Sequence, residues 1–146
     1  MPTGPLPTIV TTEMDLKLVL TAQRSVSVLA LLDYSAHEPY SVRATFRTSD
    51  GDVNWVFARE LIAEGLRKPA GDGDIAMWPS KTNDREVLCL SLSSPSGQAL
   101  MEAPRDVIEE FLARSYRVVP LGSESALIDM DLLIDRLLDS GGAASL

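Results

Sequence analysis

Residues 40–57 read YSVRATFRTSDGDVNWVF. From position 40 to position 47, apolar and polar residues alternate, which is the period of a strand with one buried face. Asp, Gly and Asp at positions 50–52 provide turn chemistry, because glycine and aspartate tolerate a positive φ. The apolar residues of positions 53–57 can then return beside the first strand. This stretch therefore predicts an antiparallel β-hairpin.

Two further strands are predicted upstream of the hairpin. Residues 10–20 show the same period of two, and residues 25–33 form a short apolar run that is typical of a well-buried strand. Residues 8–57 therefore predict a four-stranded antiparallel meander. Residues 1–7 contain three prolines and one glycine, which predicts a loose N-terminal tail.

The second half of the chain predicts helices that alternate with shorter strands. The connections are too short for parallel crossovers, so any sheet should be mainly antiparallel. We expect one α+β domain over residues 1–146, with two mainly antiparallel sheets, packed helices, the order ββββ-α-βββ(β)-α-α, and a frayed end at 140–146. The predicted elements are a helix over 58–67, a strand over 74–78 closed by Pro79, a polar loop over 80–84, strands over 86–93 and 98–102, and helices over 104–117 and 128–138.

The composition restricts the classes of function. The net charge of -8 disfavours nucleic acid as a partner, because binding to phosphates needs clustered lysine and arginine. A single cysteine closes no intramolecular disulfide, and no signal peptide or membrane-spanning apolar run is seen. We therefore expect a cytoplasmic protein that reaches a membrane only through a partner.

The sequence predicts no catalytic, cofactor or metal site. His37 and Cys89 are the only histidine and the only cysteine, so one chain cannot assemble the usual four-ligand zinc site. His37 lies in a turn-like stretch, and Cys89 lies between two leucines on a predicted strand. An enzyme would require the fold to bring these two side chains together in a cleft.

The C-terminal region contains candidate contact residues. Asp131, Asp135 and Asp139, which follow the predicted N-cap Asp129, are spaced four apart and share a helix face. They form either a solvated face or a docking surface for a basic partner. Trp78, beside a proline at the expected end of a strand, is a candidate interface aromatic.

The same predicted helix has an apolar face. That face is buried either between subunits or in the core of one chain, since helical periodicity indicates burial but not the partner. Its residues are Leu133, Ile134, Leu137 and Leu138.

Several stretches together resemble one known family. They are PYSVRATF (39–46), VNWVFARELIAEGL (53–66), PAGDGDI (69–75), MWPS (77–80), LSLSSPSGQAL (90–100) and EAP (102–104). These runs are similar to the SsgA-like proteins of sporulating actinobacteria, and the resemblance covers roughly residues 10–140. It implies a whirly-like fold, a trimer, and a role in sporulation-specific cell division at the septum. It also implies two partners, the tubulin-like protein FtsZ and an SsgA-type paralogue, with no catalytic residues.

The whirly-like fold suggests one alternative function, the binding of single-stranded nucleic acid. Such binders combine a basic groove with aromatic side chains on which bases stack. Arg43 and Arg47 share one face of a predicted strand, which gives only a small basic patch. Fold alone does not establish function, so this alternative stays second to a protein-binding role.

Overall fold

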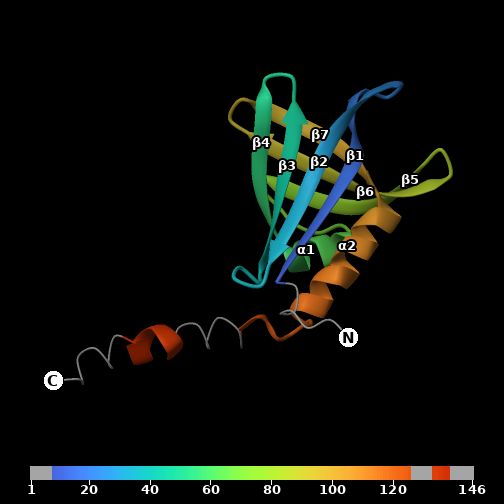
Figure 1. The fold of residues 1–146 in the computed structure, drawn as a ribbon. Coiled ribbons are helices and arrows are strands. Elements are labelled where there is room, and N and C mark those ends of the chain that lie inside the picture. Colours follow the sequence, from blue (N-terminus) through green and yellow to red (C-terminus); the bar gives the residue numbers. More distant parts are fainter. Residues whose placement is uncertain (1–7, 126–132, 139–146) are drawn as a thin grey trace.

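The computed structural model describes residues 8–125 and 133–138 (Figure 1). The described chain has seven strands and two principal helices, and it begins with the expected four-stranded meander. The elements are β1 (Ile9–Thr21), β2 (Arg24–Ser35), β3 (Ser41–Thr48), β4 (Gly51–Ala58), α1 (Arg59–Gly65), β5 (Ile75–Thr82), β6 (Arg85–Ser94), β7 (Gly97–Pro104) and α2 (Arg105–Val118).

All seven strands form one antiparallel sheet in the order β4-β3-β2-β1-β7-β6-β5. The meander β1–β4 and the meander β5–β7 meet along β1 and β7. Only two residue pairs join them there, Lys17 with Glu102 and Leu18 with Met101. The predicted α+β class with mainly antiparallel strands is confirmed. The two expected sheets are the two halves of one strongly curled sheet, because β7 pairs briefly with β1 (Figure 1).

The β5–β6 hairpin differs from the prediction. The strand expected to close at Pro79 continues to Thr82, and the expected polar loop over 80–84 is a tight turn at Asn83 and Asp84, whose φ angles are 52° and 64°. Proline is tolerated in β5 because β5 lies at the edge of the sheet, where a missing backbone N–H need not remove a ladder bond. The hairpin is therefore longer than the sequence predicted.

The core fills the concave side of the curled sheet. On β3, Val42, Ala44 and Phe46 are buried, whereas Arg43 and Arg47 are exposed, so the predicted alternation is confirmed. Both helices pack on this concave side at the end of the sheet where β1 begins (Figure 1). The buried side chains of α2 are Ile108, Phe111, Leu112 and Ser115.

The helices lie close to their predicted positions. α1 ends at Gly65, two residues before the predicted end at 67, and a Cβ atom at this position would lie only 2.7 Å from Cβ of Met77 on β5. Glycine therefore permits the close approach of α1 to the sheet. Of the third predicted helix, residues 133–138 are helical and residues 128–132 lie outside the described part.

Candidate functional site

Arg59 is the most highly connected polar side chain among the described residues. It begins α1, and only 3% of its surface is exposed. Its guanidinium lies 4.7 Å from the ring centroids of both Tyr34 and Tyr116, in cation–π geometry. Its Nη1 donates to the carbonyl oxygens of Ser115 and Val119, at 3.2 and 2.9 Å. These contacts satisfy carbonyls at the C-terminal end of α2.

The second terminal nitrogen of Arg59 forms an ion pair. Nη2 donates to Oε1 of Glu124 at 2.6 Å. The same carboxylate accepts from the backbone N–H of Gly122, whose φ is +87°. Arg59 therefore fixes both the end of α2 and the first residues that follow it. We call Arg59, Tyr34, Tyr116, Ser115 and Glu124 the Arg59 hub.

The hub shifts two pKa values. Burial raises the pKa of Tyr34 to about 12, although the Arg59 charge opposes this shift. Burial also acts to raise the pKa of Glu124. That effect is outweighed by hydrogen bonds from its own backbone N–H, from Arg59 and from Gly122, so the pKa lies below its ordinary value. Tyr34 consequently stays neutral and donates to the carbonyl of Pro39 at 2.8 Å, while Glu124 stays charged.

The two residues that an enzyme would require are not brought together. His37 is exposed in the turn after β2, and Cys89 is buried in β6. In the sheet, β1 and β7 separate these strands. Burial, and then the nearby charge of Glu102, raise the pKa of the Cys89 thiol, which disfavours the reactive thiolate. Over the described ranges, no group of three or more His, Cys, Asp or Glu side chains could hold a metal ion.

The structure places only some of the predicted contact residues. Trp78 is half-buried on the edge strand β5, opposite Cys89 of β6. Asp135 is exposed, whereas Asp129, Asp131 and Asp139 lie outside the described residues. The structure therefore does not bring Trp78 and the acidic series into one described surface.

The predicted apolar helix face is exposed. The exposed fractions are 51% for Leu133, 45% for Ile134, 60% for Leu137 and 71% for Leu138. The described residues therefore do not show this face buried in the core of one chain, which was the first of the two predicted alternatives. This face has no partner within the described chain.

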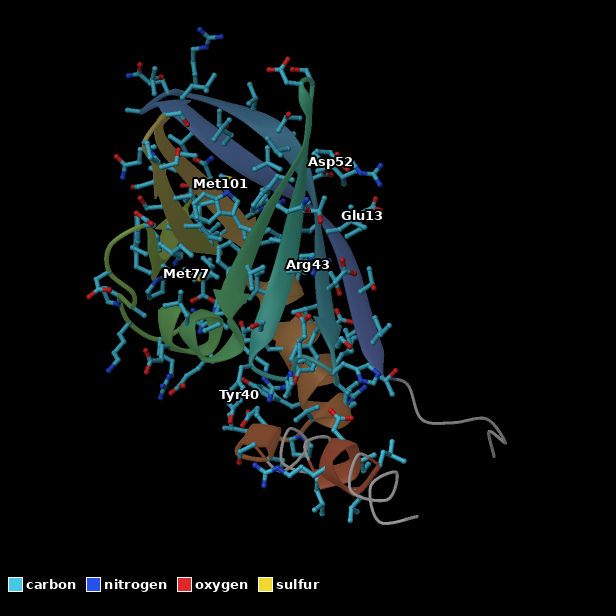
Figure 2. All side chains as sticks on the ribbon, turned by 90° about the vertical axis from the view of Figure 1, so that its left-hand side faces the viewer. Glu13, Tyr40, Arg43, Asp52, Met77 and Met101 are labelled. Carbon is cyan, nitrogen blue, oxygen red and sulfur yellow. The ribbon has the colours of Figure 1, made fainter. Side chains whose placement is uncertain are left out.

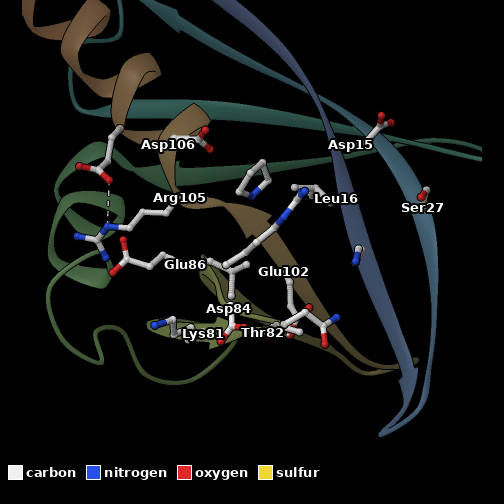
Figure 3. Close-up of a pocket in the computed structure, with 16 residues that line it drawn as sticks. Asp15, Leu16, Ser27, Lys81, Thr82, Asp84, Glu86, Glu102, Arg105 and Asp106 are labelled. Carbon is white, nitrogen blue, oxygen red and sulfur yellow. Dashed lines mark hydrogen bonds and ion pairs between the residues drawn. The ribbon is translucent and has the colours of Figure 1, made fainter.

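A polar cleft of about 1150 Å³ opens where β1 and β7 separate (Figure 3). The β5–β6 turn, β1 and the first turn of α2 surround it. Six acidic and four basic side chains line it. Some are already engaged, since Thr82 donates to Glu102 at 2.9 Å and Arg105 pairs with Glu109 at 2.9 Å. The sequence did not predict this cleft, because its walls come from segments distant in the chain.

The outer, convex face of the meander β1–β4 has mixed charge. Arg43 and Arg47 lie there, but Asp33 stands opposite Arg43, and Asp52 stands opposite Arg47. Arg43 and Asp52 are labelled in Figure 2. The aromatic Trp55 lies on the other face, opposite Ala44. The arginines therefore form neither a basic groove nor a surface with stacking aromatics, and the nucleic-acid alternative gains no support.

No helix in the described part of the chain is both long enough and apolar enough to span a bilayer.

Comparison with known proteins identifies relatives along most of the chain. Residues 28–124 match the family model described as Streptomyces sporulation and cell division protein, SsgA. The sporulation-specific cell division protein SsgB of Frankia casuarinae is 45% identical over 133 residues, which are 90% of this chain and 93% of that protein. SsgB of Streptomyces coelicolor is 45% identical over 132 residues, covering 90% of this chain and 96% of that protein.

Two solved structures share the fold. One, from a study of SsgB mutations that correlate to longitudinal cell division in Streptomyces coelicolor, has a TM-score of 0.81 and 46% identity, and the match covers 82% of this chain and 95% of that chain. An SsgA-like sporulation-specific cell division protein from Thermobifida fusca also has a TM-score of 0.81, with 41% identity over 88% of this chain and 95% of that chain. Within the SsgA-like family, the sequence stretches quoted above resemble SsgB most, and the similarity to the SsgB proteins supports that prediction. The chain therefore belongs to the SsgA family of sporulation and cell-division proteins.

Proposed function

We propose that this protein acts in sporulation-specific septation as a non-enzymatic protein that binds FtsZ, recruits it to septum sites and promotes its polymerisation. One observation carries the proposal, namely identity of 45% to sporulation-specific cell division proteins along 90% of the chain. Family resemblance supports FtsZ and an SsgA-type paralogue as partners. The protein would act in the cytoplasm at the division septum and reach the membrane only through these partners.

Multivalency would allow a small protein to promote polymerisation. An oligomer presents several copies of one weak site, and each additional contact on the same filament becomes intramolecular. Avidity can then exceed the affinity of a single site by about 10²–10⁴ without any new kind of contact. The trimer implied by family resemblance suits this mechanism.

The contact surface is proposed to include Trp78 on β5 and the acidic series Asp131, Asp135 and Asp139. A half-buried aromatic at a sheet edge can anchor a partner at low entropic cost, because tryptophan has few rotatable bonds. The carboxylates would steer a basic surface on the partner.

Co-sedimentation with FtsZ filaments tests the binding step. We expect enrichment of the protein in the filament pellet, reduced by Trp78→Ala and by a triple Asp→Asn variant at positions 131, 135 and 139. A matched control is the triple amide variant of Glu13, Asp15 and Asp52, which removes three carboxylates from the β-sheet region. Equal loss in both triple variants would indicate a general charge effect and contradict the proposed acidic surface. No enrichment of the unmodified protein would contradict FtsZ binding itself.

A further inference from the structure

The two edge strands of the sheet, β4 and β5, are protected to different degrees (Figure 1). Along an edge strand, the backbone groups of every second residue point toward the neighbouring strand, and those of the other residues point away from the sheet. We call the outward direction the free side of the strand. A row of unpaired N–H and C=O groups on a free side is a template for another strand, which is why proteins usually block it.

The free side of β5 is blocked. Met77 faces this side, because its N–H donates to the carbonyl of Ala70 at 2.9 Å and its carbonyl accepts from the N–H of Ala70 at 2.8 Å. Residues two apart on a strand direct their backbone groups the same way, so Pro79 and Lys81 also face the free side. Proline has no N–H to donate, and a lysine on an edge disfavours further pairing. This edge therefore accepts no additional strand at these positions.

The free side of β4 has none of these protections. The N–H of Arg59, the residue after β4, donates to the carbonyl of Tyr40 at 2.8 Å, so the odd-numbered residues of β4 face β3. The even-numbered residues face the free side, and all of them are exposed: Asp52, Asn54, Val56 and Ala58. Among the described residues, no backbone hydrogen bond from another element reaches them. The register between β3 and β4 runs without a bulge, and β4 contains no proline, lysine or arginine.

We propose that the free side of β4 binds an extended segment of a partner protein, which adds an eighth strand to the seven-stranded sheet. The unpaired groups specify an extended backbone, because a strand presents donors and acceptors with the same spacing. Addition of a strand to an exposed sheet edge is a recurring mode of peptide recognition, in which the backbone hydrogen bonds provide affinity. The proposal does not depend on the binding of FtsZ.

The strand that already pairs with β4 indicates which side chains suit it. On β3, apolar residues point inward and basic residues point outward, with Arg47 opposite Asp52. A strand on the free side meets the same two faces of β4, because side chains alternate between the faces of a sheet. Val53 and Trp55 face inward, and Asp52 faces outward. The partner segment should therefore alternate apolar and polar residues and place a lysine or arginine opposite Asp52.

Charge favours a different protein over a second copy as the source of this segment. The only charged residue of β4 is Asp52, so a second β4 strand has no cation to place opposite it. The other edge strand, β5, is blocked at Met77, Pro79 and Lys81. A partner with a basic, alternating segment fits the free side of β4 better than either edge of this chain does.

A peptide with the sequence of β3, SVRATFRT, is a suitable probe, because it has the side-chain pattern expected of the partner. Amide hydrogen exchange of the folded protein, followed by NMR, reports where the peptide binds. We expect exchange at Asn54 and Val56 to slow about tenfold when the peptide concentration is about ten times the Kd. Exchange at Val53 and Trp55, whose N–H groups face β3, should change little.

Matched peptides and protein variants separate backbone pairing from other contacts. In the register of β3, an N-methyl group on Thr45 of the peptide removes an N–H that faces β4, whereas one on Ala44 removes an N–H that faces away. Only the first methylated peptide should fail to slow exchange. Val56→Pro copies the block that proline gives β5 and should abolish the effect, whereas Val56→Thr keeps the N–H and should retain it. Circular dichroism checks the fold of both variants, and the methylated peptides leave the protein itself unaltered.

Three results would overturn the proposal. If exchange at Asn54 and Val56 does not slow at the highest soluble peptide concentration, the edge does not bind such a strand. Equal effects of the two methylated peptides would exclude backbone pairing as the mode of binding. Slow exchange at these two residues before any peptide is added would show that the edge is already covered. The cover would be a second copy if dilution restores fast exchange, and another segment of the same chain if it does not.

Discussion

Replacing Arg59 by alanine should lower the free energy of unfolding more than any exposed arginine substitution. The guanidinium is 3% exposed, donates to two carbonyls at the end of α2, pairs with Glu124 and lies between two tyrosine rings. Removing one partner of such a buried pair costs about 3–5 kcal/mol. The individual contacts would sum to more, but contacts that share one side chain are not additive.

Two further variants separate the contribution of the ion pair from that of the other contacts of Arg59. Glu124→Gln removes only the ion pair and leaves the contacts of Arg59 with Ser115, Val119 and the rings, so we expect a loss of about 1–2 kcal/mol. Arg59→Lys keeps the charge but lacks the planar set of donors, so its stability should lie between that of Arg59→Ala and that of the unmodified protein. Arg43→Ala, at an exposed arginine of β3, is the matched control and should change stability by less than about 0.5 kcal/mol.

Urea unfolding followed by tryptophan fluorescence measures these differences in the free energy of unfolding.

The ion pair should also make stability depend on pH. The pKa of Glu124 is lower in the folded state, so the contribution of Glu124 to the free energy of unfolding is present above the ordinary pKa of 4.5 and is lost as the pH falls through the folded value. The stability difference between the unmodified protein and Glu124→Gln should therefore shrink in acid. Equal losses in Arg59→Ala and Arg43→Ala would refute the argument that Arg59 is a buried hub.

Three further predictions follow from buried contacts. Gly65→Ala should lower the free energy of unfolding by about 1–3 kcal/mol, because the new Cβ would lie 2.7 Å from Met77, and thermal unfolding measures this. Stability should fall as the pH rises above about 10, where unfolded tyrosine ionises while Tyr34 stays protonated up to about 12, and Tyr34→Phe should weaken this dependence. Cys89 should react with a thiol reagent only slowly until urea unfolds the chain, since its thiol is buried and its pKa is raised.

The strands could be predicted from sequence because their signal is local. The structure confirms the alternation from position 40 to position 47 and the hairpin that follows it, but the turn lies at residues 49–50, and Gly51 and Asp52 already belong to β4. Pro79 misled the prediction for a physical reason. Proline ends a central strand but is tolerated at an edge, and only the strand order identifies β5 as an edge.

The Arg59 hub and the polar cleft could not be predicted in the same way. Arg59 stands 56 residues before Ser115 and 65 residues before Glu124, so no short window contains both the cation and its acceptors. Sequence patterns also favour an exposed position for an arginine at the start of a helix. The cleft likewise depends on the two-residue contact between β1 and β7, which is formed by segments about 85 residues apart in the chain.

The candidate contact residues could also be predicted only in part from the sequence. Periodicity identified Leu133, Ile134, Leu137 and Leu138 as one apolar face, but it could not distinguish burial within a chain from burial between chains. The face is exposed in the described chain, and its burial between chains stays a prediction. Trp78 was identified as a candidate anchor from its neighbour Pro79, and its half-buried position on an edge strand is compatible with that prediction.

The assembly of purified FtsZ, followed by light scattering with and without this protein, tests whether the protein promotes FtsZ polymerisation. The proposed function predicts that scattering rises faster and to a higher plateau in its presence, and that Arg43→Ala behaves as the unmodified protein does. If well-folded protein leaves both the rate and the plateau of FtsZ assembly unchanged, the proposal that it promotes FtsZ polymerisation is contradicted.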